Sequence, residues 1–361
     1  MWSQTYQKKK LGLDIELTTN CNARCPQCSR TDQHNYLKRK EWLPIKQVSL
    51  KEFQNWFPKS EHLNSITNFH FSGTYGDPGM CKDLKYIVEY IISNTDTTTI
   101  SINTNGSMRD EEFWFEIGVL GGKRLKIIFD VDGIDQEMHS FYRRGTNLKK
   151  ILSNIETACQ TMANIAVLTV VFQHNEDYVE EIQDMCRKLG VTEFDVVEGN
   201  NFEHGPTYSF IDEKGNQQEL KQITRKDREQ GLDRLNRIVR DHRHNLHETH
   251  KYIECAAAKE MSLQISSNGL VTPCCFLSQP LEQMTTYRPY LNHNTNITTN
   301  GKDELNNVMK KFINRNNDFN LNHKNIDEIV NDIWYTKELS SSFHSKDTSS
   351  FACKKVCGKC L

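Results

Sequence analysis

The sequence contains no long apolar run. Nowhere in its 361 residues does an apolar stretch approach the roughly 18 residues of a membrane-spanning helix, so no membrane partner is expected. Residues 1–10 are polar and end in three lysines, and no apolar stretch of the signal-peptide kind follows them. We therefore expect a soluble, cytoplasmic protein. At roughly 150 residues per domain, the length predicts about two domains.

A strong excess of either charge is also missing. Lys and Arg number 45 and Asp and Glu 47, which gives a formal net charge of −2. Such a balance provides no global basic field to attract nucleic acid, and we expect no nucleic-acid partner. Residues 220–252 are a local exception, with six arginines beside a helical apolar stripe. We interpret them as a solvated surface helix; contact with substrate or nucleic acid is the alternative.

Cysteines are too few for a disulfide scaffold in a chain of this length, but they are strongly grouped. Nine of the twelve fall into three groups. Without a secretion signal, such groups indicate metal ligands before disulfides. The groups are Cys21, Cys25 and Cys28; Cys255, Cys274 and Cys275; and Cys353, Cys357 and Cys360.

Apolar residues alternate with polar ones in six segments, and helical patterns separate these segments. Alternation of period two predicts strands, and a period near 3.6 predicts helices. This order favours parallel βαβ units, in an open barrel or a doubly wound sheet, with the functional groups beyond the C-terminal ends of the strands. The predicted strands are 11–17, 67–72, 98–103, 125–131, 165–172 and 193–198; the predicted helices are 49–57, 83–92, 110–117, 148–162 and 178–189, the last with Asn175 as its cap and Gly190 as its stop.

The first cysteine group directly follows the first predicted strand. Its three thiolates lie within eight residues, close enough in sequence to bind one metal centre. A structural zinc site usually takes four protein ligands, whereas a 4Fe–4S cluster with three cysteine ligands keeps one iron open to a small molecule. A zinc loop completed by a distant Cys or His, and ordinary buried cysteines, are the alternatives.

The C-x3-C-x2-C spacing of Cys21, Cys25 and Cys28, just after the first strand of a βα-repeat, resembles the radical S-adenosylmethionine (SAM) superfamily. The resemblance covers roughly residues 11–200 and implies a partial (βα)6 barrel within the α/β class. It also implies that the three cysteines hold a 4Fe–4S cluster, and that SAM chelates the open iron through its amino and carboxylate groups.

Segments at the ends of later strands carry the same resemblance. Residues 71–78 resemble the family's Gly-Gly-Glu-Pro motif, which contacts the SAM amino group, with Tyr75 in place of a glycine and Asp77 in place of the glutamate. A glycine lets the backbone approach a ligand, and a carboxylate pairs with an ammonium group; a simple turn is the alternative. The SAM contacts that the resemblance implies are Gly76, Asp77, Pro78, Asn103, Asp130 and Arg144, the arginine for the SAM carboxylate, with cap or turn roles as the alternative for the single polar residues.

The C-terminal cysteines resemble the SPASM and twitch extensions of the same superfamily. Cys255 is followed by Gly269 and Cys274 with the spacing of their opening motif, and a predicted hairpin over 262–276 brings these two thiolates together. A zinc knuckle on the same thiolates is the alternative. The resemblance implies a second 4Fe–4S cluster on Cys255, Cys274, Cys357 and Cys360, with Cys353 as an alternative ligand and Cys275 spare.

The chain therefore divides into three predicted parts: a radical SAM core at 1–205, a charged helical linker at 206–254 and a twitch-like iron–sulfur domain at 255–361. Inside the last part, residues 292–331 hold 13 asparagines. This composition predicts an irregular insertion around one helix at 303–313.

The function that the resemblance implies is enzymatic. Reductive cleavage of SAM gives a 5′-deoxyadenosyl radical, which removes a hydrogen atom from the substrate. No substrate-binding motif stands out; a small molecule or a peptide is expected as substrate, and a reductase, flavodoxin or ferredoxin as electron donor. The alternatives are an iron–sulfur electron carrier without SAM chemistry and a zinc-stabilised RNA- or protein-binding module.

Overall fold

The computed structural model describes residues 11–199, 202, 205–224, 252–287, 307–344, 353 and 357–359. The backbone packs as two units. Residues 17–47 and 70–236 form the first, which we name the core unit. Residues 1–16, 48–69 and 237–361 form the second, which we name the terminal unit.

All six predicted strands are present, within a mostly parallel sheet of order β13-β12-β1-β4-β5-β6-β7-β8. The α/β class predicted from the alternation of strands and helices is therefore confirmed. The strands are β1 Leu11–Glu16, β4 Ile66–Ser72, β5 Thr99–Thr104, β6 Leu125–Asp130, β7 Asn164–Val171, β8 Glu193–Glu198, β12 Ser262–Ile265 and β13 Val271–Thr272.

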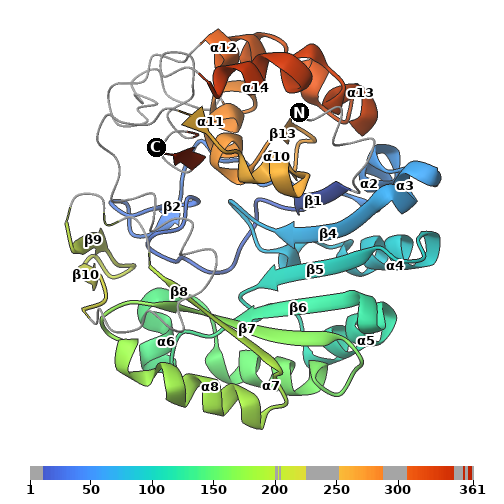
Figure 1. Cartoon of the computed structure of the whole chain (residues 1–361). Helices are drawn as coiled ribbons and strands as arrows, with labels where there is room; N and C mark the ends of the chain where they lie inside the picture. The colour runs from blue at the N-terminus through green and yellow to red at the C-terminus, as the bar shows by residue number, and fades with distance from the viewer. Residues whose placement is uncertain are drawn as a thin grey trace. The chain divides into compact units, whose positions relative to one another are not determined.

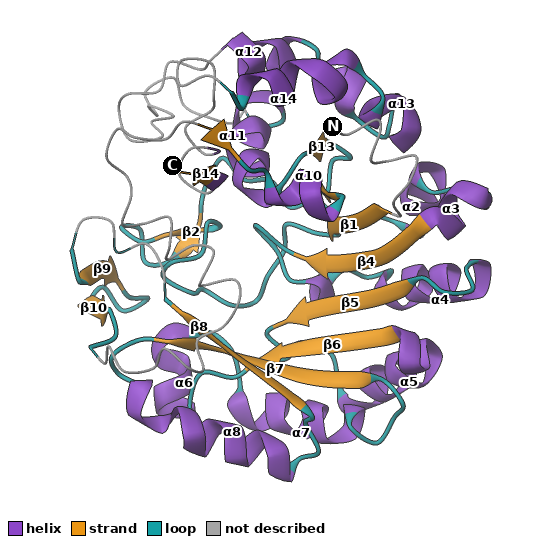
Figure 2. Cartoon of the chain, viewed as in Figure 1, coloured by secondary structure: helices purple, strands orange, loops and turns teal. Residues whose placement is uncertain are grey.

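In the core unit, β5, β6, β7 and β8 pair in parallel and lie side by side (Figure 1). Most of their buried positions are apolar, with Ile102 opposite Ile127 and Ile127 opposite Ile165, because β-branched side chains pack well on a pleated surface. Parallel strands need crossover connections, which are usually helices, and Figure 2 shows helices alongside these strands. They are α4 Leu84–Asn94, α5 Glu111–Gly121, α6 Gln136–Tyr142, α7 Leu148–Ala158 and α8 Val179–Lys188.

Short polar side chains set the starts of these helices. Asp110 and Asn147 each accept a hydrogen bond from the backbone amide three residues later, at the N-termini of α5 and α7. Gly190, with a φ of +100°, follows the end of α8 as predicted. Asn175 takes the N-cap position of the short helix η3 (Glu176–Tyr178), which precedes α8, but its side chain makes no cap bond there.

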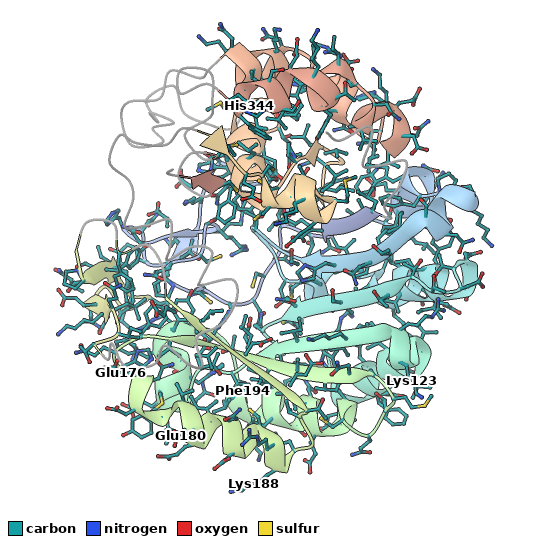
Figure 3. The ribbon with its side chains drawn as sticks, viewed as in Figure 1. Lys123, Glu176, Glu180, Lys188, Phe194 and His344 are labelled. Atoms are coloured by element: carbon teal, nitrogen blue, oxygen red, sulfur yellow. The ribbon has the colours of Figure 1, made fainter. Side chains whose placement is uncertain are left out.

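A β-hairpin follows the sheet in the core unit. Its strands β9 (Thr207–Ile211) and β10 (Gln217–Lys221) pair antiparallel. The prediction of a charged helix that begins at residue 220 is therefore wrong at its start, because residues 220 and 221 belong to β10. The hairpin is tied back to η3, since both carboxylate oxygens of Glu176, labelled in Figure 3, accept from Thr224. The rest of the predicted charged helix, 225–251, lies outside the described residues.

In the terminal unit, β12 pairs in parallel with β1 and antiparallel with β13, which confirms the predicted hairpin and its turn at Gly269. A capping box between Ser49 and Glu52 starts α2, as predicted. The Asn-rich stretch is more regular than predicted, because Asn325 and Glu328 form a second capping box that starts α13; its residues 292–306 lie outside the described residues. The helices of this unit are α2 Leu50–Trp56, α3 Glu61–Ser65, α10 Ala256–Glu260, α11 Cys275–Thr285, α12 Asn307–Asn314, α13 Ile326–Val330, the π-helix η6 Trp334–Glu338 and α14 Leu339–Ser342.

None of the described helices is long and apolar enough to cross a membrane.

Candidate active site

The first cysteine group lies on a loop, residues 17–47, that follows β1 and belongs to the core unit. Thr19 closes this cysteine loop: its hydroxyl donates to the carbonyl of Pro44 at 2.7 Å and accepts from the amide of Lys46 at 2.8 Å. Inside the loop the amide of Cys28 donates to the carbonyl of Cys25 at 3.1 Å. The loop is therefore fixed at its base and turned tightly at the cysteines.

The three thiols lie close enough to affect one another, in surroundings poor in water. Burial, with a smaller contribution from Cys28, raises the pKa of Cys25 to about 12. Burial, and then the charges of Asp77, Cys25 and Cys28, raises the pKa of Cys21 well above 9.0. A bound metal centre displaces such protons and takes the thiolates as ligands. Three neighbouring thiols, one buried and two half-buried, fit a 4Fe–4S cluster, in which each cysteine binds a separate iron.

Cations stand beside these thiols. Arg143 lowers the pKa of Cys25, and Arg30 lowers that of Cys28, each against the larger effect of burial. The guanidinium of Arg30 is itself held in place, since its Nε donates to the carbonyl of Thr19 at 3.1 Å. These positive charges would offset part of the negative charge that thiolate ligands bring into a dry site.

An apolar shell covers the cysteine loop. Phe210 and Leu220, from strands β9 and β10, are almost fully buried in one cluster with Cys25. Hydrogen bonds fix the hairpin to the loop: the hydroxyl of Tyr208 donates to the carbonyl of Pro26 at 3.0 Å, and the amide of Ile211 to that of Gln33 at 2.8 Å. The remaining buried members of this cluster are Ala23, Leu37, Tyr142 and Phe172.

The segment predicted to contact the SAM amino group packs directly on the cysteine loop. A Cβ added to Gly76 would lie 1.8 Å from the carbonyl oxygen of Thr18, so only glycine fits there. The next amide, of Asp77, donates to the carbonyl of Asn20 at 2.8 Å. Gly76 therefore allows a close approach of backbone to backbone, and Pro78 begins the short helix η1 (Pro78–Met80).

Asp77 is buried, with 5% exposed area, and its carboxylate accepts four hydrogen bonds from within the core unit. One oxygen accepts from the amide of Gly79 and the hydroxyl of Thr104, both at 2.8 Å. The other accepts from the amide and the side-chain amide of Asn105, both at 2.7 Å. A carboxylate offers about four lone-pair positions, so these donors occupy its capacity. The structure thus gives Asp77 a bracing role, and its contact with SAM stays a prediction.

Asn105 is the residue that sequence reasoning missed in this segment. It directly follows β5 and is 3% exposed. Its side-chain nitrogen lies 2.9 Å from Oδ1 of Asn22 and 3.7 Å from the Sγ of Cys21. The predicted SAM contact on the same strand, Asn103, instead bonds to His70 Nε2 at 2.9 Å. The strand-end sequence Asn-Thr-Asn contained this signal, but nothing in it distinguished one asparagine from the other.

Asp130, at the end of β6, faces Arg143 across 2.9 Å. Burial, opposed by Arg143, raises the pKa of Asp130 to about 7, and Asp132 and Asp77 add to the rise. Asp132 is fully buried and accepts from the Nε of Arg143 at 2.6 Å. One arginine therefore joins two carboxylates beside Cys25, and this ion-pair group was not predicted from the sequence.

Backbone and side-chain donors hold Asp132 in its turn. Its carboxylate accepts from the amide of Val170 at 2.7 Å, and its own amide donates to Nδ1 of His139 at 3.2 Å. The side chain of Asn175 also serves here, because its Nδ2 donates to the carbonyls of Asp132 and Val170, both at 3.0 Å. Buried polar groups in this network therefore have partners, as a rigid turn requires.

Arg144, the predicted partner of the SAM carboxylate, has protein partners in the core unit, and its contact with SAM stays a prediction. Its Nη1 pairs with Glu213 at 2.9 Å, and its guanidinium stacks over Phe210 at 5.2 Å from the ring centre. Its carbonyl accepts from the amide of Arg24 at 2.8 Å. Arg144 thus joins the cysteine loop to the β9–β10 hairpin, whereas the neighbouring Arg143 faces the cysteines.

The terminal unit gathers the other cysteines. The strands β11 (Tyr252–Ile253) and β14 (Gly358–Lys359) pair antiparallel, and the amide of Glu254 donates to the carbonyl of Cys357 at 3.1 Å. This pairing carries Cys357 to Cys255, whose pKa burial raises to about 11 with a contribution from Cys357. Burial, and then the charges of Cys275, Cys353 and Cys255, raises the pKa of Cys274 well above 9.0. Cys360 lies outside the described residues.

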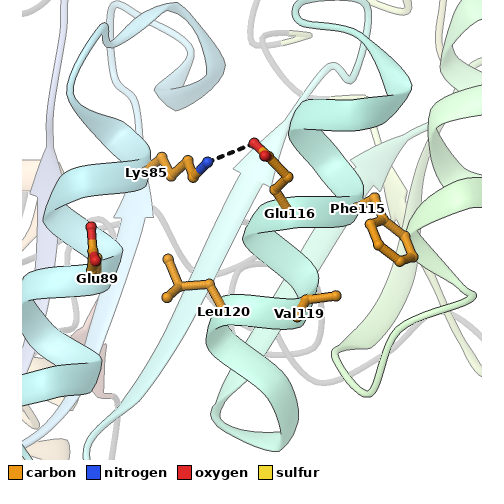
Figure 4. Close-up of a pocket in the computed structure, with 6 residues that line it drawn as sticks. All are labelled: Lys85, Glu89, Phe115, Glu116, Val119 and Leu120. Carbon is orange, nitrogen blue, oxygen red and sulfur yellow. Dashed lines mark hydrogen bonds and ion pairs between the residues drawn. The ribbon is translucent and has the colours of Figure 1, made fainter.

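Within the described part of the chain, no three His, Cys, Asp or Glu side chains converge on a single-ion site. A surface pocket lies between α4 and α5, where Lys85 pairs with Glu116 at 2.6 Å (Figure 4). It holds none of the cysteines.

Comparisons with known proteins agree with the geometry. The model of the radical SAM superfamily matches residues 15–186. The molybdenum cofactor biosynthesis protein moc-5 of Caenorhabditis elegans is 27% identical over 55% of this chain and 32% of its own length. A GTP 3′,8-cyclase of Campylobacter jejuni is 22% identical over 74% of this chain and 81% of its own. The chain thus spans about a third of the first relative.

Solved structures show the same fold. Streptococcus suis SuiB bound to its precursor peptide SuiA has a TM-score of 0.56 at 14% identity, covering 93% of this chain and 67% of its own. Native anSMEcpe with bound AdoMet has a TM-score of 0.52 at 13% identity, covering 91% of this chain and 84% of its own.

Proposed function

Since this chain belongs to the radical SAM superfamily, we propose that it cleaves SAM at the cysteine loop and uses the 5′-deoxyadenosyl radical to remove a hydrogen atom from its substrate. The observation that carries the proposal is the proximity of Cys21, Cys25 and Cys28. Cys25 is buried and the other two are half-buried, and the charges of Cys25 and Cys28 raise the pKa of Cys21. When bound, a 4Fe–4S cluster supplies the electron that breaks the S–C5′ bond of SAM.

The residues around the triad provide what such chemistry needs from a protein. The apolar shell of the β9–β10 hairpin excludes water, which protects a radical from side reactions. Arg143 and Arg30 place positive charge beside the thiols. Asp130, joined to Arg143 at the strand end, is a carboxylate available to the polar groups of SAM, and Asn103 is a further candidate contact.

We assign a second 4Fe–4S cluster to the terminal unit. Cys357 affects the pKa of Cys255, and Cys353 and Cys255 affect that of Cys274. These couplings support Cys255 and Cys274 as two ligands, with two of Cys353, Cys357 and Cys360 as the others. The β11–β14 pairing supports this assignment, since it joins the two cysteine groups across about 100 residues of chain.

The substrate is a small molecule or a peptide. GTP is the first small molecule to test, because relatives carry the name GTP 3′,8-cyclase; a peptide is the second, because SuiB shares the fold and binds a precursor peptide. A flavodoxin, ferredoxin or reductase would deliver the electron, in a cytoplasmic setting.

Anaerobic reconstitution with iron and sulfide, followed by dithionite and SAM, tests the proposal. We expect 5′-deoxyadenosine from the native chain and none from the variant Cys21→Ala, Cys25→Ala, Cys28→Ala. The matched control replaces Cys81, Cys159 and Cys186 by Ala, which removes as many thiols outside the groups and should retain cleavage.

Three outcomes contradict the proposal. Undiminished cleavage in the triad variant would refute the cluster assignment. Iron and sulfide without SAM cleavage would indicate an iron–sulfur electron carrier. Zinc in place of iron would indicate a structural module.

A further inference from the structure

We propose, on the premise that Cys21 is a ligand of the cluster in the proposed function, that Asn105 is a positioning residue that donates an N–H···S hydrogen bond to Cys21 and raises the reduction potential of that cluster. In the core unit, Asn105 Nδ2 lies 3.7 Å from Cys21 Sγ. Asn105 would touch neither SAM nor iron, and would act through the ligand sulfur.

The orientation of the Asn105 amide is fixed by its neighbours. Its Oδ1 accepts from the amide of Ser107 at 3.0 Å, so the oxygen is committed to the turn after β5. Its nitrogen therefore faces the other way, toward Asp77 Oδ2 at 2.7 Å. Because a carboxylate accepts and a backbone amide donates, a flipped amide would oppose both contacts. The side chain must present N–H groups toward the cysteine loop.

Three acceptors share the two hydrogens of this nitrogen. Asp77 takes the shortest contact, and Asn22 Oδ1 lies at 2.9 Å on the loop residue that follows Cys21. The Sγ of Cys21 is the third. Asp77 also accepts from the backbone amide of Asn105 at 2.7 Å, so this carboxylate holds Asn105 at two points. Asn105 is therefore a buried, doubly anchored donor beside one ligand of the triad.

The sign of the effect follows from electrostatics. Reduction adds negative charge to a cluster and its sulfur ligands, and a donor aimed at a ligand sulfur stabilises that added charge. Removing the donor must lower the potential. A hydrogen bond to a charged group changes an equilibrium by a factor of about ten or more, and tenfold is 59 mV for a one-electron couple.

A redox titration of the reconstituted holoenzyme without SAM, followed by electron paramagnetic resonance, measures this potential. The triad cluster is identified as the signal that changes when SAM is added afterwards. We expect Asn105→Ala to lower its potential by about 59 mV, which is tenfold. The control, Asn164→Ala, removes an asparagine of β7 that bonds to Glu193, and should leave the potential unchanged.

A second variant keeps the test decisive if Asn105→Ala fails to fold. Asn22→Ala removes the acceptor that competes with Cys21 for the same nitrogen, so the bond to sulfur strengthens and the potential should rise. Opposite shifts in the two variants support the role of Asn105. An unchanged potential in Asn22→Ala, or in a folded Asn105→Ala, overturns it. Absence of any cluster in the native chain would instead refute the proposed function.

Discussion

Replacing Asp77 by Ala tests whether this carboxylate serves the fold or SAM. The change removes one buried acceptor group and leaves four donors behind. Two of them can adapt, because the Thr104 hydroxyl can rotate its hydrogen toward another acceptor, and the Asn105 side chain still donates to Asn22. The backbone amides of Gly79 and Asn105 lose the bonds that Asp77 provides.

The magnitude follows from those two amides. A buried donor without a partner costs about 1–3 kcal/mol, so together they cost roughly 2–6 kcal/mol. Part of this is returned, since burial raises the pKa of Asp77 and its removal relieves the cost of a desolvated charge. We expect a net loss of about 2–4 kcal/mol. At a few degrees per kcal/mol, the melting temperature should fall by roughly 5–10 °C.

The assay is thermal unfolding of the chain without SAM, next to SAM binding by the reconstituted protein. The matched variant Asp77→Asn keeps one oxygen for Gly79 and Thr104, and should lose about half as much stability. The reasoning would be refuted if Asp77→Ala melted within about 1 °C of the native chain while SAM affinity fell tenfold. A carboxylate free to bind the SAM ammonium would behave in that way.

Two further predictions concern other parts of the chain. His139 is buried, and burial is the main reason that its pKa is lowered from 6.5 to about 4. As the pH falls, the unfolded chain therefore binds a proton at this histidine before the folded chain does. We expect a loss of about 3 kcal/mol of stability between pH 6.5 and pH 4. Urea midpoints across this range should show less loss in His139→Asn, and an equal slope in both proteins would contradict the assignment. Iron analysis should find about eight irons per reconstituted chain, on four per cluster, and about four after Cys255→Ala with Cys274→Ala or after deletion of residues 353–361. SAM cleavage should survive both changes, and a native chain with about four irons and one zinc would disprove the second cluster.

The sheet could be predicted because its signal is local. A strand such as β6 alternates buried and half-buried residues at period two, and this pattern can be recognised within six consecutive residues of the sequence. Helix starts were equally readable where one side chain caps the backbone, as in the capping box of Ser49 and Glu52. The cysteine loop was found because its three thiols lie within eight residues.

Contacts between distant residues could not be predicted in the same way. Asp77 had the right chemistry for an ammonium group, but its bonds to Thr104 and Asn105 depend on the packing of two strand ends. Arg143 and Arg144 are adjacent in sequence, and only the fold decides that one faces Cys25 and the other Glu213. The β9–β10 hairpin was missed because its flanking charges suggested a helix.

The hairpin that covers the cysteine loop has a consequence for biosynthesis. The hydroxyl of Tyr208 reaches the carbonyl of Pro26 across 182 positions of sequence. A ribosome that adds about 5–20 residues per second needs roughly 10–35 s to make the intervening chain. For that interval the triad thiols have been synthesised while the segment that covers them has not. Iron and sulfide delivered during translation would therefore meet a cysteine loop that the hairpin does not yet cover.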